Sequence, residues 1–134
     1  SDLGGGQRIT MERIGLRREL ADQADFLLFY TGWDRYWGTE RYFEGYPCID
    51  GEVADYVLER RKKGVGLDTI SLDPTADGNL TLHKKLFREG EMVAIENLKD
   101  LGLLGEGLFT LCALPLYHQD ADGAPARVVA ILEE

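Results

Sequence analysis

Two residues whose side chains commonly bind metal ions bracket a short segment of the chain, His83 and Glu96. The pattern between them predicts a helix after His83, a turn and a strand that ends at Glu96. About six helical residues advance roughly 9 Å, and the strand returns by about 16 Å. The two side chains are therefore expected to lie close together at one edge of a sheet. An imidazole beside a carboxylate suits zinc or manganese, although two ligands alone do not complete a site.

Two aspartates are candidates to support this pair. Asp68 ends a predicted buried strand, and Asp73 lies in the polar loop that follows it. Loops at the carboxyl ends of strands are where open α/β sheets bind ligands. We expect Asp68 and Asp73 to orient His83 or to position the loop, because ligand histidines usually donate their other ring N–H to a nearby acceptor.

Two tryptophans are candidates for a substrate pocket. Trp33 and Trp37 belong to a segment, residues 30–46, that contains seven aromatic residues and follows neither the helix nor the strand period. An aromatic-rich loop after a strand often lines a pocket, so we expect both tryptophans to form a pocket wall. The alternative, that the rings cover a sheet edge, stays open.

Composition narrows the classes of partner and compartment. The net charge is −9, with 24 acidic against 15 basic residues, which argues against a nucleic-acid or anionic-membrane partner because phosphate binding needs a basic face. The sequence contains neither an apolar run long enough to span a membrane nor a signal-peptide pattern. Cys48 and Cys112 lack metal or redox spacing and are expected to be free thiols in a reducing cytoplasm.

Hydrophobic periodicity predicts short strands that alternate with short helices. Strands are expected at 25–30, 65–68, 91–96, 108–116 and 126–132, and helices at 11–21, 51–62 and 82–88. Asp50 is the expected N-cap of the second helix, and Gly64 is expected to end it as the C′ residue. This order predicts an α/β fold with a mixed sheet in one domain, residues 1–134.

Several sequence segments, taken in order, resemble those of one family. They are TGW at 31–33, GVGLDT at 64–69, SLD at 71–73, His83 followed by AIENL at 94–98, ALPL at 113–116 and DGAPARVVAI at 122–131. Together they are similar to the cyclase family of metal-dependent hydrolases, which includes bacterial kynurenine formamidases. The resemblance implies a swivelling β/β/α domain, assembly into oligomers, and zinc- or manganese-dependent hydrolysis of amides or related carbonyl compounds. His83 and Glu96 correspond to two of the family's metal ligands.

One feature departs from the family pattern. The family's other ligands come from an HxGTHxDxP motif, which this sequence lacks, and its two histidines are His83 and His118. The chain thus resembles the C-terminal two-thirds of such an enzyme, truncated on its N-terminal side. A fragment, a natural truncation and half of a split protein all fit, and whether this chain alone holds a metal ion stays open. His118 has no partner at ligand spacing and is interpreted as a surface or interface residue.

Two functional hypotheses follow. In the first, the chain is part of a hydrolase that uses metal-activated water on a small-molecule substrate. In the second, it is a non-catalytic homologue that serves as an oligomerising or interaction module. A truncated sheet would expose an edge or an apolar face, which predicts a homo-oligomer in either case.

Overall fold

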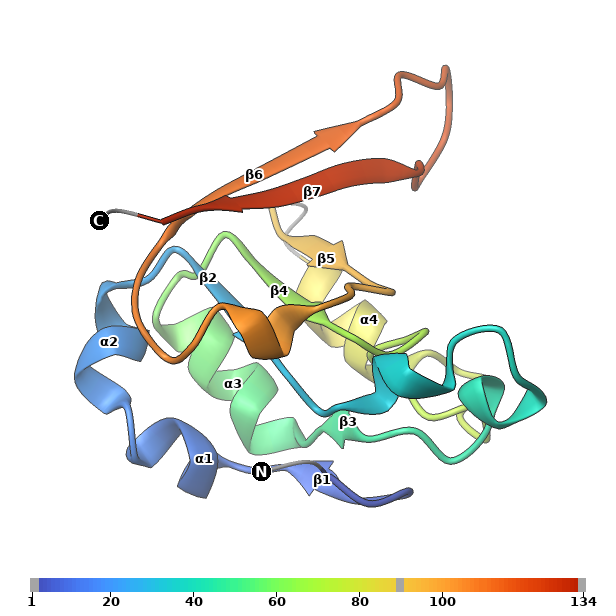
Figure 1. Cartoon of the computed structure of the whole chain (residues 1–134), viewed down its shortest axis with the longest axis horizontal. Helices are drawn as coiled ribbons and strands as arrows, with labels where there is room; N and C mark the ends of the chain where they lie inside the picture. Colours follow the sequence, from blue (N-terminus) through green and yellow to red (C-terminus); the bar gives the residue numbers. More distant parts are fainter. Residues whose placement is uncertain (1–2, 89–90, 133–134) are drawn as a thin grey trace. The chain divides into compact units, whose positions relative to one another are not determined.

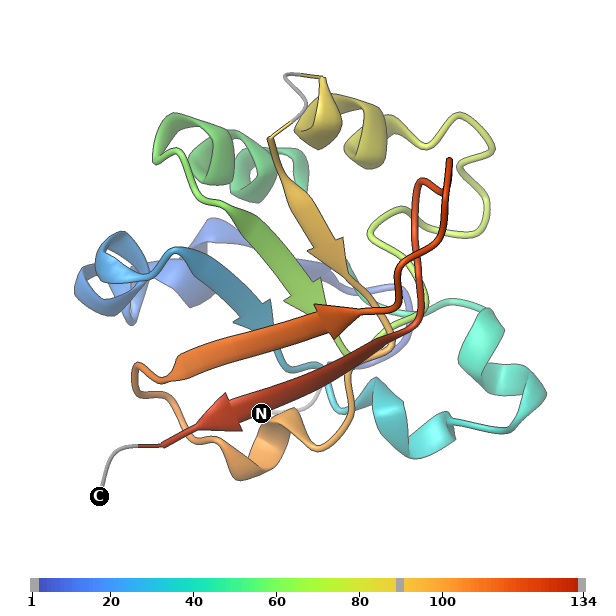
Figure 2. The ribbon, with the colours of Figure 1, turned by 90° about the horizontal axis from the view of Figure 1, so that it is seen from above.

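The computed structural model describes residues 3–88 and 91–132. The chain divides into two units, Ser1–Leu103 and Leu104–Glu134, and each is described by itself. In the first unit, three parallel strands form a sheet in the order β2 (Phe26–Phe29), β4 (Gly64–Leu67) and β5 (Val93–Ile95) (Figure 2). The central strand β4 is buried along its whole length.

Short helices and a second small ladder complete the first unit (Figure 1). The ladder pairs β1 (Arg8–Ile9) with β3 (Cys48–Ile49) in parallel. The helices are α1 (Met11–Gly15), α2 (Arg18–Gln23), α3 (Gly51–Glu59) and α4 (Thr81–Phe87), with 3-10 turns at Trp33–Tyr36, Glu40–Phe43 and Leu101–Leu103. Strands alternate with short helices, which confirms the predicted α/β class.

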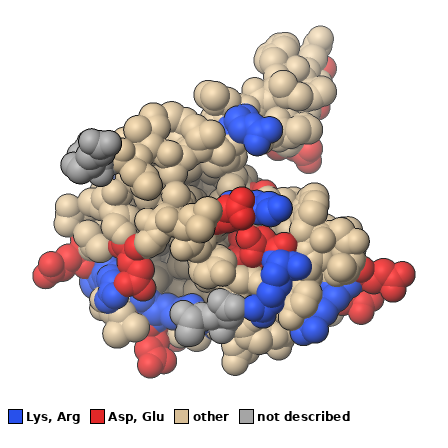
Figure 3. Space-filling model, viewed as in Figure 1, with Lys and Arg blue, Asp and Glu red and all other residues tan. Residues whose placement is uncertain are grey.

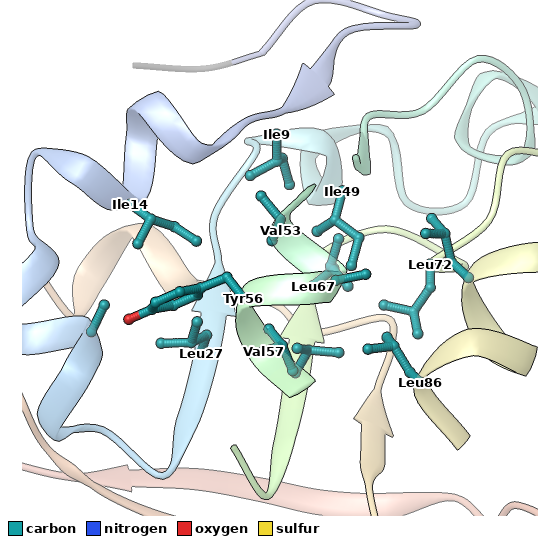
Figure 4. Close-up of a cluster of buried hydrophobic side chains, with 14 of the residues drawn as sticks. Ile9, Ile14, Leu27, Ile49, Val53, Tyr56, Val57, Leu67, Leu72 and Leu86 are labelled. Atoms are coloured by element: carbon teal, nitrogen blue, oxygen red, sulfur yellow. The ribbon is translucent and has the colours of Figure 1, made fainter. Parts of the chain in front are cut away.

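The main core lies where α3 and α4 pack on the sheet. Val53 and Val57 of α3 are fully buried, and they cluster with Leu27 of β2, Leu67 of β4 and Leu86 of α4 (Figure 4). Apolar positions four apart place both valines on one face of the helix. Burying each such side chain contributes about 1.5–3 kcal/mol relative to leaving it exposed. This core fixes β4 and α4, the two elements that lead into and out of the loop with Asp68 and Asp73.

The start of α3 confirms one prediction and its end corrects another. Asp50 caps the helix, since its Oδ1 accepts from the backbone N–H of Val53 at 2.8 Å. The C′ position, however, belongs to Arg61, with φ +50°, and not to Gly64. The N–H of Arg61 donates to Leu58 O and that of Lys62 to Val57 O, both at 3.0 Å, which is the Schellman pattern.

Gly64 has a different role, as the first residue of β4. It pairs with Phe26 on one side and Val93 on the other. A Cβ at this position would overlap the Phe26 ring and the Val93 carbonyl oxygen. The glycine is therefore needed for close packing within the sheet.

The predicted helix over 11–21 is two helices in the structure. The first ends at Gly15, and Arg17 has φ −135° and ψ 31°, which is not helical. Glycine has low helix propensity, which favours a break at this point. Ile14 and Ala21, one from each helix, are buried in the main core.

The second unit is an antiparallel hairpin. β6 (Thr110–Pro115) pairs with β7 (Ala126–Ile131), from Thr110 opposite Ile131 to Pro115 opposite Ala126. Pro115 ends its strand, as a proline at a strand edge does. Within the described residues of each unit, no helix is long and apolar enough to cross a membrane.

Candidate functional site

His83 lies between two carboxylates. Its Nδ1 is 2.6 Å from Oδ2 of Asp73, and its Nε2 is 3.1 Å from Oε1 of Glu96. The imidazole side chain is 21% exposed and that of Glu96 is 27% exposed, whereas that of Asp73 is 1% exposed. The proximity of His83 and Glu96 that the sequence predicts is confirmed, and of the two carboxylates Glu96 is the partly exposed one.

Asp73 also caps the helix that carries His83. Its Oδ1 accepts from the backbone N–H of Leu82 at 2.7 Å, and its Oδ2 accepts from the backbone N–H of His83 at 3.0 Å. The residue in the N-cap position itself, Leu80, has φ +53° and makes no side-chain cap. The carboxylate of Asp73, from the preceding loop, thus replaces the usual N-cap side chain. Its negative charge also interacts favourably with the positive end of the helix dipole.

These contacts determine which nitrogen of His83 can bind a cation. Asp73 accepts three hydrogen bonds and is buried, so it holds the proton of a neutral imidazole on Nδ1. Nε2 then presents a lone pair to a carboxylate oxygen of Glu96 that already accepts from the N–H of Leu72 at 3.1 Å. Two acceptors at such a distance repel one another unless a proton or a metal ion lies between them.

The pair therefore fits two positions of a divalent metal site. Ligand atoms about 2.0–2.2 Å from one ion are roughly 3 Å apart in an octahedral site and roughly 3.4 Å apart in a tetrahedral site, and the 3.1 Å between Nε2 and Oε1 lies between these distances. A set of three or more His, Cys, Asp and Glu side chains arranged for a metal ion is not found within 3–88 and 91–132. His83 and Glu96 would thus hold an ion together with water or other ligands.

The buried carboxylate of Asp68 binds a different part of the chain. It accepts hydrogen bonds at 2.7–3.1 Å from the backbone N–H groups of Thr31, Gly32 and Trp33 and from the Thr31 hydroxyl. Both carboxylate oxygens are used by these donors. Of the two predicted aspartates, Asp73 contacts the imidazole, whereas Asp68 positions the turn that follows β2.

The two tryptophans differ in exposure. Trp33 is 2% exposed, and its indole N–H donates to the carbonyl of Tyr42 at 3.1 Å. Its ring lies in a buried aromatic cluster, so the structure gives Trp33 a packing role in place of the predicted pocket wall. Trp37 is 57% exposed and packs edge-on against the Tyr42 ring, so it stays a candidate for ligand contact.

Sequence reasoning missed two tyrosines that contact the loop 68–73. The Tyr46 hydroxyl donates to the carbonyl of Asp73 at 2.7 Å. The Tyr42 hydroxyl lies 3.3 Å from the carbonyl of Asp68 and 2.9 Å from Oδ1 of Asn97. The only sequence signal was the density of aromatic residues after β2, which does not specify partners.

An open hollow borders the imidazole. It has a volume of about 330 Å³ and is lined by Leu80, His83, Lys84, Phe87 and Arg88. The Phe87 ring packs edge-on against His83, with centroids 5.6 Å apart. A small molecule can therefore approach His83 from the exposed side of α4.

Comparison with known proteins shows the family of this chain. Residues 4–74 match the family model described as "Putative cyclase", and the chain belongs to this cyclase family. The matched stretch includes Asp68 and Asp73 and ends before His83 and Glu96. The predicted family and its α/β fold class are thereby confirmed.

Relatives extend the similarity over nearly the whole chain. An uncharacterised protein of Methanocaldococcus jannaschii is 34% identical over 131 residues, which are 96% of this chain and 64% of that protein. Kynurenine formamidase of Bacillus cereus is 36% identical over 90 residues, 67% of this chain and 42% of the enzyme. A solved structure described as a potential metal-dependent hydrolase with cyclase activity superposes with a TM-score of 0.63 at 31% identity, over 93% of this chain and 58% of the other. The chain thus spans about two-fifths to two-thirds of these relatives' lengths.

Proposed function

We propose that this chain contributes His83 and Glu96 to the metal site of a hydrolase that cleaves amides or related carbonyl compounds. The observation that carries the proposal is the 3.1 Å approach of His83 Nε2 to Glu96 Oε1, with Asp73 on the other ring nitrogen. Membership of the cyclase family and the formamidase and metal-dependent hydrolase relatives support it. Small formamides are the first substrates to test, and zinc and manganese are the first ions.

Each residue of the site has a distinct part in this proposal. His83 and Glu96 would hold the ion. Asp73 keeps the imidazole proton on Nδ1, so that the lone pair of Nε2 is free to bind the ion. When bound, a divalent ion would supply an activated water and polarise the substrate carbonyl. The hollow beside His83 would give a small carbonyl compound access to the imidazole.

Metal retention tests the proposal directly. After zinc or manganese loading and dialysis, the wild-type protein is expected to retain close to one ion per chain by plasma mass spectrometry, and His83→Ala to fall to background because Nε2 is lost. Glu96→Gln should also lose the ion, since an amide oxygen can still accept from Leu72 but carries no charge. His118→Ala is the matched control, because it removes an exposed imidazole from the second unit.

The outcomes separate metal binding from hydrolysis. Metal-free wild-type protein after loading, or equal retention in His83→Ala, would show that this pair does not hold an ion in this chain. A retained ion without formamide hydrolysis would support the metal site and reject hydrolysis by this chain alone.

We also propose a cytoplasmic location, which the free thiols of Cys48 and Cys112 support.

A second function, a homo-oligomerising module, is favoured by the hairpin β6–β7. The register places Thr110, Cys112, Leu114, Arg127, Val129 and Ile131 on one face, and the opposite face is formed by Leu111, Ala113, Pro115, Ala126, Val128 and Ala130. The second face is wholly apolar and the first carries one charged residue, Arg127, and Figure 3 shows most of this hairpin's visible surface without charge. A two-stranded hairpin is marginally stable alone, and pairing its edge with a second copy would form a four-stranded sheet.

Charge on the exposed hairpin face is expected to abolish this assembly. Val129 and Ile131 are 44% and 54% exposed, and the variants Val129→Lys and Ile131→Lys should convert an oligomer at micromolar concentration to a monomer in sedimentation velocity. Leu16→Lys, at a 72% exposed position outside the hairpin, should leave the oligomer unchanged. A wild-type protein that sediments as a monomer would contradict the proposal.

A further inference from the structure

The loop 68–73 connects the two halves of the proposed site. Its last residue, Asp73, holds the imidazole of His83, and the N–H of its Leu72 donates to the Glu96 carboxylate. A displacement of this loop would therefore change the orientation of both proposed ligands at once. What fixes the loop also fixes the distance between Nε2 and Oε1.

Two buried tyrosine hydroxyls reach the two ends of this loop. Tyr46, 5% exposed, donates to the carbonyl of Asp73 at 2.7 Å. Tyr42, 1% exposed, lies with its hydroxyl 3.3 Å from the carbonyl of Asp68 and 2.9 Å from the side chain of Asn97. Asn97 directly follows Glu96 in the chain. One tyrosine therefore contacts the Asp73 end, and the other contacts both the Asp68 end and the residue beside Glu96.

Tyr42 is itself held by the turn after β2. The carbonyl of Tyr42 accepts from the indole N–H of Trp33, whose backbone N–H donates to Asp68. Burial, together with nearby carboxylates such as that of Asp68, raises the pKa of Tyr42 to about 12, and burial also raises the pKa of Tyr46. Both hydroxyls consequently remain protonated hydrogen-bond donors at neutral pH.

We propose that Tyr42 and Tyr46 are positioning residues that hold the loop 68–73 and thereby set the facing geometry of His83 and Glu96. The inference rests on the proposed metal site and assigns to the aromatic segment a role in building that site. The two tyrosines touch neither Nε2 nor Oε1 and act through Asp73, Leu72 and the chain around Glu96. Loss of either hydroxyl should change the orientation of the His83 imidazole while altering the fold little.

The test removes single hydroxyls and observes the imidazole without metal. Tyr42→Phe and Tyr46→Phe are compared with wild type by the ¹⁵N shifts of the His83 ring, with the signals of His118 assigned from His118→Ala. We expect the ring signals of His83 to move in both variants, because the Asp73 carboxylate that accepts from Nδ1 is displaced. The second measurement is zinc and manganese affinity by calorimetry, for which a loss of about 10-fold is expected from residues that support a ligand.

Tyr56→Phe is the matched control. Tyr56 is also a buried residue, and its hydroxyl donates at 2.6 Å, but to Asp22 of helix α2. This variant should lower the melting temperature about as much as Tyr46→Phe while leaving the His83 signals and the metal affinity unchanged. A generic loss of stability would affect all three variants alike.

The outcomes distinguish this inference from the proposed function. If Tyr42→Phe and Tyr46→Phe behave like Tyr56→Phe in both measurements, the positioning role is overturned. If wild-type protein binds no ion, the proposed function fails, and the ¹⁵N shifts alone decide the role of the tyrosines. Shifted His83 signals then support it, and unchanged signals reject it.

Discussion

Asp68→Asn is expected to lower the free energy of unfolding of the first unit by about 3 kcal/mol or more. The wild-type carboxylate is fully buried and accepts from three backbone N–H groups and one hydroxyl in the turn Thr31–Trp33. Asparagine offers one acceptor oxygen, and its amide N–H₂ would face N–H donors that cannot rotate away. At least one buried donor then loses its partner, and each such loss costs about 1–3 kcal/mol.

Urea unfolding followed by tryptophan fluorescence measures this effect in the first unit, to which Asp68 belongs. The two tryptophans of the chain, Trp33 and Trp37, both belong to the first unit. Asp25→Asn is the control, because Asp25 is 67% exposed and forms a 2.8 Å surface ion pair with Lys63, which contributes about 0–1 kcal/mol. Equal unfolding midpoints for the two variants would show that the Asp68 hydrogen bonds do not hold the turn.

Gly64→Ala is expected to destabilise the first unit by about 3 kcal/mol, the upper end of the usual range for overpacking. The new Cβ would overlap the Phe26 ring and the backbone oxygen of Val93, on the two strands that flank β4. The ring could rotate, but the carbonyl oxygen is fixed by the sheet ladder. The strands can accommodate the methyl group only by moving apart and weakening the hydrogen bonds between them.

Two further glycines provide an ordered comparison. At Gly66 the new Cβ would meet the side chains of Leu28 at 2.6 Å and Leu98 at 2.8 Å, which are flexible, so Gly66→Ala should cost less than Gly64→Ala. Gly78→Ala meets nothing within 4 Å and should be neutral or slightly stabilising. The same urea measurement should rank the three variants in this order, and a neutral Gly64→Ala would contradict the packing role assigned to the glycine.

Local patterns in the sequence were sufficient for the elements that local interactions control. The apolar runs predicted β2 and β4, because strands of a parallel sheet are rich in apolar residues; β4 is buried throughout, whereas in β2 only Leu27 is buried. Asp50 identified the start of α3, since its capping bond reaches only three residues ahead. The same reasoning placed His83 and Glu96 together, because a short helix followed by a returning strand leaves few other positions for the two side chains.

Local sequence patterns could not predict which residues far apart in the chain contact one another. Asp68 and Asp73 look alike in the sequence, but one binds the turn at Thr31, 37 residues away, and the other binds His83, 10 residues away. Which carboxylate receives which donors depends on how the loop passes between β2 and α4. The sequence could therefore propose both aspartates as supports for His83 but could not choose between them.

The sequence by itself determined the family and the α/β class, and it predicted that His83 and Glu96 lie together. The tertiary structure decided that Trp33 is buried, that Asp73 caps α4 and contacts the His83 ring, that Arg61 is the C′ residue expected to be Gly64, and that two tyrosine hydroxyls contact the loop 68–73. The physical reason is the range of the interactions. Propensity, capping and periodicity act within a few residues, whereas burial and hydrogen-bond partners are set by segments that meet only once the core has formed.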